Sequence, residues 1–256
     1  MMRQQWRQLL LLVAFLLFPL TIYYFSPVFP VVGAAKGVIT GSLVVFGTMG
    51  VAAMIFGRTY CGWCCPAAGL QEVCFAVNSK PALGGRYDAI KYLLWVPWIT
   101  AIIVISVRYG GYHKLDFFFG TEHGLSVHDA VGYTIYFAMV AIIVVMGILG
   151  GRRAFCHYLC WMAPFMVIGA RLRRLIPGVG VRLERRVAEC RHCGLCSRHC
   201  PMSLNVEKLM QQLRPFHDEC VLCGRCADVC PQAAIALAFW TKGKSDDGWR
   251  AGADRL

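Results

Sequence analysis

Four long runs without a charged residue constrain the fold of this 256-residue chain more than any other feature. A helix that crosses the hydrocarbon core of a bilayer needs about 20 apolar residues. Charged residues make up only 16% of the chain, whereas a soluble domain has about a quarter. The sequence therefore predicts an α-helical multi-pass membrane protein with four transmembrane helices, one in each of the runs 8–35, 37–57, 92–107 and 130–151.

The first run is longer than a single span requires. Pro27 and Pro30 disfavour a continuing helix, so the first span is expected to end near Phe25. The basic start MMRQQWRQ and the small residues at 32–34 also allow a cleaved signal peptide. The apolar stretch is longer than a signal core usually is, which favours a retained helix.

Basic residues indicate the orientation of the spans. They flank the start of the first span, the end of the second, the start of the third and the end of the fourth, whereas the opposite side holds only Lys36, Arg108 and Lys114. The positive-inside rule then predicts a protein of the bacterial inner (cytoplasmic) membrane with both termini in the cytoplasm. The net charge of +12 comes largely from arginines at the ends of apolar runs, where anionic membrane lipid is the expected partner rather than nucleic acid.

The carboxyl-terminal part carries two copies of one cysteine pattern, CRHCGLCSRHCP and CVLCGRCADVCP. Three closely spaced thiolates can hold one iron–sulfur cubane, while the fourth, next to proline, reaches the other cluster. We therefore assign two 4Fe-4S clusters, with all eight cysteines on the cytoplasmic side. The first cluster takes Cys190, Cys193, Cys196 and Cys230, and the second takes Cys220, Cys223, Cys226 and Cys200. Zinc also binds C-x-x-C pairs, but it does not account for two identical runs that both end in proline.

Basic side chains surround these motifs, among them Arg191, His192, Arg198, His199 and Arg225. Their charge would stabilise a reduced cluster and raise its potential. An ordinary basic surface that faces lipid headgroups is the alternative interpretation.

The membrane part contains an internal repeat. The string RTYCGWCCP starts at Arg58 and RAFCHYLCW starts at Arg153, each directly after an apolar run. The paired cysteines are four residues apart, so on a helix each pair would share one side. They are candidates for a third metal or redox site, or for a reversible thiol pair with Cys64 as resolving partner; the alternative is a packing role. The four candidates are Cys61, Cys65, Cys156 and Cys160.

The expected organisation has three parts. Residues 1–175 form a membrane domain of two repeated helical hairpins, each followed by a Cys-x-x-x-Cys motif, and 176–240 form a cytoplasmic α+β ferredoxin domain with two 4Fe-4S clusters. Residues 241–256 are polar and are expected to be a loose tail. Cys74 has no partner in the sequence and is expected to be buried in a helix.

From about residue 9 to residue 231 the chain resembles the NapH-type membrane ferredoxins, which are ferredoxin-type quinol dehydrogenase components, and the NosR-type proteins that share their core. GRTYCGWCCPAAGLQE carries the resemblance most closely, whereas the second copy has Trp161 after Cys160 and its proline only at Pro164. The resemblance implies a membrane-bound iron–sulfur protein that passes electrons between the quinone pool or another donor and a partner respiratory oxidoreductase. A redox-driven maturation or assembly factor for another respiratory metalloenzyme is the alternative, and a structural anchor within a complex is a third.

Other chemistry has weaker support in the sequence. No catalytic triad, nucleotide-binding loop or Rossmann glycine pattern is present, so no catalytic residue is assigned. Haem is not expected, because CHYLC lacks the order that attaches haem c. The loop between the third and fourth spans could bind a metal or a quinol headgroup, although an amphipathic cap is the simpler interpretation; its candidate residues are His113, His123, His128, Asp116 and Glu122.

Overall fold

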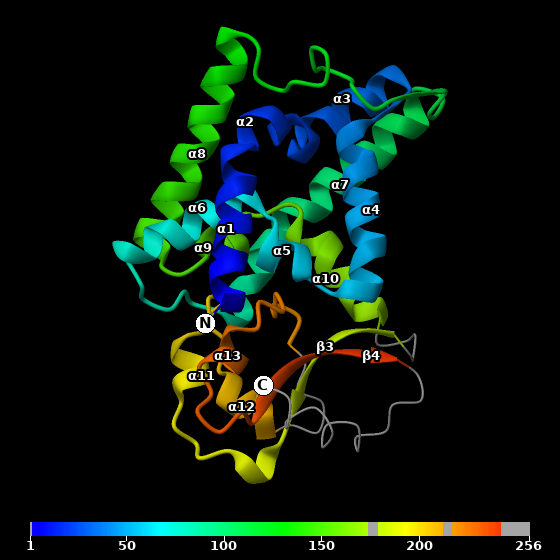
Figure 1. Cartoon of the computed structure of the whole chain (residues 1–256). Coiled ribbons are helices and arrows are strands. Elements are labelled where there is room, and N and C mark those ends of the chain that lie inside the picture. The colour runs from blue at the N-terminus through cyan, green and yellow to red at the C-terminus, as the bar shows by residue number, and fades with distance from the viewer. Residues whose placement is uncertain (1, 174–178, 212–216, 242–256) are drawn as a thin grey trace.

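The computed structural model describes residues 2–173, 179–211 and 217–241. Helices fill the amino-terminal two thirds of the chain, and a small α+β unit lies at one end of them (Figure 1). The helical part contains α1 Met2–Leu16, α2 Phe18–Thr21, η1 Ile22–Phe25, α3 Val28–Lys36, β1 Val38–Thr40, α4 Gly41–Phe56, α5 Thr59–Trp63, α6 Pro66–Val73, η2 Cys74–Ala76, η3 Gly85–Ala89, α7 Ile90–Arg108, β2 Lys114–Asp116, α8 Ala130–Gly150, α9 Ala154–Tyr158 and α10 Ala163–Leu172.

Two helical segments among the described residues are long and apolar enough to cross a membrane, namely Gly85–Arg108 and Ala130–Gly150. Two further pairs pass the same test as bent units: Met2–Leu16 with Phe18–Phe25, bent by 58°, and Gly41–Phe56 with Thr59–Ala76, bent by 95°. The count is therefore two spans, or up to four if each bent pair is one span. The apolar helices agree with a membrane protein, and the four-span topology stays a prediction.

The first helical stretch ends at Phe25, as expected from the prolines, and after Ser26 the chain forms a separate helix, α3. Pro27 is the N-cap of α3, and Pro30 lies in its first turn. The N–H groups of a first turn have no partner within the helix, so proline costs little there. The expectation that the first helical stretch ends near Phe25 is therefore confirmed, and the prolines are tolerated at the start of the helix that follows.

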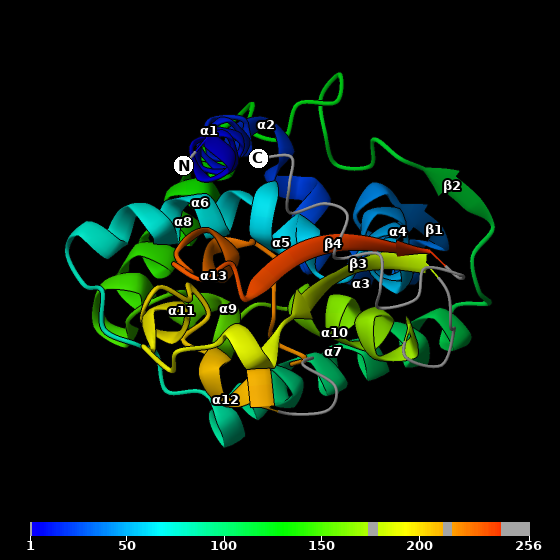
Figure 2. The same cartoon turned by 60° about the horizontal axis from the view of Figure 1, so that its bottom comes forward.

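The α+β unit comprises β3 Val179–Arg185, η5 Val187–Glu189, α11 Leu195–Arg198, α12 Val206–Gln211, α13 Arg225–Asp228 and β4 Ile235–Thr241. The two strands pair antiparallel, from Val179 opposite Thr241 to Arg185 opposite Ile235, so the unit's ends meet in one ribbon. Figure 2 shows this ribbon beside α13 and α12. The expected domain boundary near 175 and residues 242–256 of the expected tail lie outside the described residues.

One buried carboxylate fastens the α+β unit to the helices. Glu219, 4% exposed, has its Oε2 2.6 Å from Arg58 Nη1 and its Oε1 2.6 Å from Lys91 Nζ at the start of α7. Burial alone would raise the pKa of Glu219, but the charges of Arg58 and Lys91 outweigh burial and lower its pKa to about 2. The carboxylate is therefore ionised at neutral pH, and it balances two buried cations.

A second buried ion cluster joins the amino-terminal helix to both repeats. Glu72 lies between Arg7, at 2.6 Å, and Arg153, and both arginine side chains are fully buried. Arg7 also donates to the carbonyl of Gly62 at 3.1 Å, and Arg153 donates to that of Cys61 at 2.8 Å. The expectation that arginines at the ends of apolar runs face lipid was wrong for these two and for Arg58, because each finds a carboxylate inside the protein.

Replacing Glu219 with glutamine should destabilise the contact between the α+β unit and the helices. Arg58 and Lys91 would keep their charges in a buried position, which costs about 3 kcal/mol or more. The loss would be measured as a lower thermal midpoint and as faster proteolysis of the α+β unit in lipid nanodiscs. Glu189→Gln is the control, since Glu189 pairs with Arg186 at the surface and its loss should cost about 1 kcal/mol or less. Equal effects of the two changes would contradict the fastening role.

Candidate metal centres

The eight cysteines of the repeated pattern line two separate cavities in the α+β unit. The outer cavity is lined by thiols from the first loop and one thiol from the end of the second motif, namely Cys190, Cys193, Cys196 and Cys230. The inner cavity, next to the helices, is lined by the converse set, Cys200, Cys220, Cys223 and Cys226. The structure thus brings the thiols together in the crossed grouping that the sequence analysis assigned.

The backbone of both loops has the same conformation. Gly194 and Gly224 are left-handed, with φ of 71° and 74°, and so are the residues two positions earlier, His192 and Leu222, with φ of 53° and 50°. Alternation of this kind turns successive N–H groups to one side of the chain and forms a concave site for an anion. Such a site fits an iron–sulfur cluster, whose sulfur atoms accept hydrogen bonds from the backbone.

The spacing of the thiols fits a cluster better than a single zinc ion. Four thiolates bound to zinc at about 2.3 Å would lie about 3.8 Å from one another. In the part of the chain that the structure describes, only Asp88, His157 and Glu219 bring three ligand atoms of His, Cys, Asp or Glu within 4.8 Å. Both oxygens of Glu219 already contact Arg58 and Lys91, so this group is a salt-bridge cluster rather than a metal site.

Burial keeps the Cys200 and Cys220 thiols protonated until a cation is present. It raises the pKa of Cys200 to about 11 and that of Cys220 to about 12. A metal binds the thiolate, so loading of the inner group must release protons.

The four cysteines of the membrane repeat lie near one another, and three of them are buried. Cys61, Cys65 and Cys156 are 5–7% exposed, while Cys160 is partly buried. Cys61 and Cys156 belong to the same packed core as Cys200, Cys223 and Cys226, so this core extends from the repeat to the inner thiols. The structure therefore brings Cys61 and Cys156 together across the repeat and against the α+β unit, with Cys65 and Cys160 in two adjoining packed clusters close enough to interact electrostatically with them.

The two members of each pair do not share one helix, contrary to the expectation. Cys61 lies in α5, but Cys65 has φ −79° and ψ 122°, an extended conformation, and is the N-cap of α6. Pro66 follows, and a residue before proline is pushed out of the helical region. In the second copy Cys156 lies in α9, and Cys160 lies in the turn between α9 and α10. These breaks let the thiols of the two copies converge.

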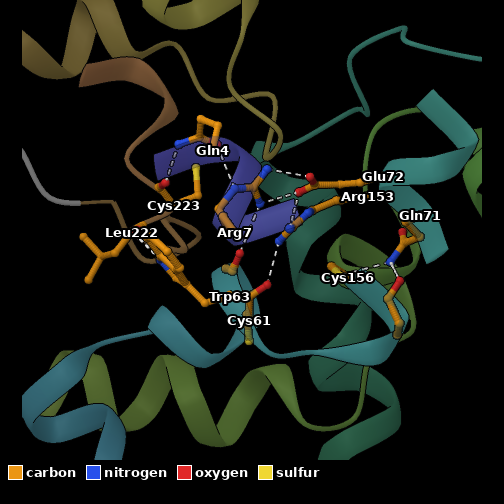
Figure 3. Close-up of polar contacts among 12 residues, drawn as sticks. Gln4, Arg7, Cys61, Trp63, Gln71, Glu72, Arg153, Cys156, Leu222 and Cys223 are labelled. Atoms are coloured by element: carbon orange, nitrogen blue, oxygen red, sulfur yellow. Dashed lines mark hydrogen bonds and ion pairs between the residues drawn. The ribbon is translucent and has the colours of Figure 1, made fainter. Parts of the chain in front are cut away.

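Polar residues that the sequence analysis did not single out hold this core together (Figure 3). Gln71 joins the two repeats, because its Nε2 lies 3.2 Å from Cys156 Sγ and its Oε1 accepts from the Phe155 N–H at 2.9 Å. The indole of Trp63 donates to the carbonyl of Leu222 at 3.2 Å, from α5 to the inner loop. Trp63 lies inside RTYCGWCCP and corresponds to Tyr158 in the second copy, whereas Gln71 corresponds to Met166, so neither polar group is marked by the repeat.

A glycine allows the closest approach between the repeat and the inner loop. A Cβ atom at Gly62 would lie 2.3 Å from the carbonyl oxygen of Val221, which no side chain tolerates. The loop that carries Cys220 and Cys223 therefore lies directly against α5.

The remaining candidates do not form a site. In the loop between α7 and α8, His113 and His123 are exposed, and His128 lies 4.0 Å from Glu122 at the surface. Cys74 is 7% exposed and contacts the backbone position of Gly147 in α8, as expected for a packing residue.

Comparisons with known proteins agree with these centres. Residues 189–235 match the family described as a 4Fe-4S dicluster domain. Residues 38–82 and 131–179, which contain the two copies of the repeat, match the family described as a 4Fe-4S binding domain. The chain is thus similar to the NosR-related ferredoxin-type 4Fe-4S proteins.

Its relatives are distant. The putative electron transport protein YccM of Escherichia coli is 24% identical, over 80% of this chain and 57% of its own length. Protein NirI of Paracoccus denitrificans is 27% identical, over 72% of this chain and 26% of its own. An uncharacterized protein of Methanocaldococcus jannaschii is 25% identical, over 75% of this chain and 69% of its own length. No solved structure matches the chain.

The crossed grouping makes a specific prediction for pairs of substitutions. Cys190→Ala with Cys230→Ala removes two ligands from one centre, so the EPR signal of the other reduced cluster should remain. Cys190→Ala with Cys200→Ala removes one ligand from each centre, so both signals should change. Cys74→Ala should leave the spectrum and the iron content as they are. If the first pair disturbs both signals and the second pair only one, the grouping is wrong.

Proposed function

We propose that this ferredoxin-type protein passes electrons between a donor in the membrane and a partner respiratory oxidoreductase. The eight thiols would hold two 4Fe-4S clusters, and each cluster supplies one-electron transfer. The chain's own residues set the burial, the order and the surrounding charge of the two centres. The names of YccM, an electron transport protein, and of the ferredoxin-type protein MauN support the same general activity.

The unequal burial of the two thiol groups is the observation that carries this proposal. Cys200, Cys223 and Cys226 of the inner group are each 8% exposed, and their loop lies on α5. No thiol of the outer group is buried, and Cys193 is exposed. An inner centre against the membrane helices and an outer centre near solvent form the order that a relay from membrane to partner needs.

A cavity beside the membrane part supports a lipid-soluble donor such as quinol. It has a volume of about 430 Å³ and lies between the loop before η3 and the ends of α8 and α9. A volume in this range suits a small-molecule ligand. Its walls combine the exposed apolar Leu83 and Leu149 with Tyr87, Tyr158 and Lys80, and Tyr158 is two residues from Cys156 in α9.

The four thiols of the repeat support a further centre next to the inner group, because Cys61 and Cys156 pack in one core with inner thiols. They converge from two segments that both match a 4Fe-4S binding family, and the charge of Arg153 acts on both Cys156 and Cys223. We therefore propose that Cys61, Cys65, Cys156 and Cys160 hold a third iron–sulfur centre. A cation close to a cluster stabilises its reduced form, so Arg153 would favour electron residence at this junction.

Reduction by a quinol tests the proposed function. Protein purified without oxygen and placed in nanodiscs should show cluster EPR signals after a quinol analogue is added. Dithionite provides the control for intact clusters. If dithionite produces the signals and the quinol analogue does not, the quinol donor is excluded and the electron relay remains. If dithionite produces none, the relay itself fails.

Iron content tests the third centre. Cys61→Ala with Cys156→Ala should lower the iron content by about four per chain relative to the unchanged protein. Cys64→Ala is the matched control, because Cys64 lies between Cys61 and Cys65 but is exposed. Unchanged iron in the double variant, with dithionite spectra like those of the control, would remove the third centre and leave the two others.

A further inference from the structure

The outer thiol group opens onto a basic surface, which we call the outer basic face. Arg191 and His192 lie beside Cys193 in the first loop, and Arg198 and His199 follow at the end of α11. All four side chains are exposed, as is Cys193. The most accessible thiol of the α+β unit is therefore surrounded by positive or protonatable groups.

The arginines of this face have no carboxylate partner within the described part of the chain, whereas the neighbouring acids do. Glu189 pairs with Arg186 at 2.9 Å, and Glu207 lies 3.3 Å from His192. Arg191 and Arg198 thus contribute two uncompensated charges, and the exposed Lys208 on α12 adds a third. Unpaired cations at a surface attract a negatively charged partner over a distance of about one Debye length, ~8 Å at physiological salt.

The basic side chains of the outer basic face differ in their partners from those next to the helices. Figure 1 places α11 and the loop before it below the apolar helices, and Figure 2 brings that side of the unit forward. The basic residues nearest to the helices are used differently, since Arg171 contacts Asp218 at 2.6 Å and Arg173 donates to the carbonyl of Val181 at 2.7 Å. Arg152, directly after α8, donates to the carbonyl oxygens of Arg198 and Cys200. The arginines next to the helices thus bind within the protein, whereas the guanidinium groups of Arg191 and Arg198 have no carboxylate partner among the described residues.

We propose that the outer basic face is the docking surface for an acidic, carboxylate-rich soluble electron carrier. The inference rests on the proposed function and names the kind of partner that would exchange electrons with the outer centre of this protein. One electron crosses between the outer centre and the carrier's own flavin or iron cofactor, so one is oxidised as the other is reduced. An iron cofactor needs no proton for this step, whereas a flavin that becomes the neutral semiquinone takes one proton from solvent. Transient electron-transfer interfaces are small and rely on charge complementarity, which a few unpaired basic side chains near an exposed centre can supply.

Charge reversal tests the proposal with defined probes. Arg191→Glu with Arg198→Glu changes the charge by the same amount as the control, Arg86→Glu with Lys114→Glu, at exposed positions of the helical part. The probes are flavodoxin, an acidic carrier, and cytochrome c, a basic one, added to protein in nanodiscs of neutral lipid. Binding is followed by titration at low salt and in 0.5 M salt, which reduces the Debye length to about 4 Å. The rate at which dithionite-reduced protein is oxidised is followed with ferricyanide and with hexaammineruthenium.

The unchanged protein should bind flavodoxin at low salt and lose most of this binding at high salt. The Arg191/Arg198 variant should bind it at least about tenfold more weakly and react more slowly with anionic ferricyanide but not with the cationic oxidant. The control variant should match the unchanged protein. Failure of flavodoxin to bind, equal weakening in the control variant, or preferred binding of anionic lipid vesicles by the same arginines would each overturn the docking surface.

The outcomes also separate this inference from the proposed function. EPR of every variant after dithionite shows whether the clusters are present. Intact clusters without carrier binding reject only the docking surface, whereas absent clusters in the unchanged protein reject the relay on which it rests.

Discussion

The contact of Glu219 with Arg58 and Lys91 decides how the two parts of this protein meet. The carboxylate belongs to the residue directly before Cys220, Arg58 stands at the end of α4, and Lys91 begins α7. All three side chains are buried. Removing any one of them would leave an uncompensated charge inside the protein, where charge is poorly solvated. The inner thiol loop is thereby held against α5, where Gly62 leaves room for its backbone. The burial of the inner centre and the exposure of the outer one both follow from this contact.

The two copies of the repeat use their arginines for different tasks. Arg58 reaches across to the α+β unit, whereas Arg153 turns inward to Glu72 and to the carbonyl of Cys61. The single α+β unit provides a carboxylate partner for the arginine of the first copy only. The two copies of the repeat therefore differ in their contacts although their sequences are similar. The delayed proline of the second copy fits this difference, because α10 begins only at Ala163 and leaves Cys160 in a turn.

The sequence predicted those features that depend on local spacing. The uncharged run before Arg152 becomes α8, which starts at Ala130, and the two cysteine patterns fold into loops of one conformation. It failed where tertiary partners decide the outcome. Arg7, Arg58 and Arg153 look like lipid-facing residues until their carboxylates are located, and those carboxylates lie 65–161 positions away in the chain. Cys61 and Cys65 have helical spacing, but α5 ends at Trp63 and Pro66 keeps the preceding Cys65 out of the helical conformation.

The buried ion clusters at this junction do more than stabilise the contact between the α+β unit and the helices. Well-packed apolar residues often stabilise an interface as well as a buried ion pair does, so stability alone is a weak reason for five charged and buried side chains here. Their position offers another: the charges of Arg58 and Arg153 act on thiols of the repeat and on Cys220 and Cys223 of the inner group. A net positive field there favours the more negative, reduced state of any cluster held by these thiols. The same guanidinium groups thus position the inner centre and set its electrostatic surroundings. A substitution that weakens the contact between the α+β unit and the helices should therefore also change the reduction potential of the inner centre.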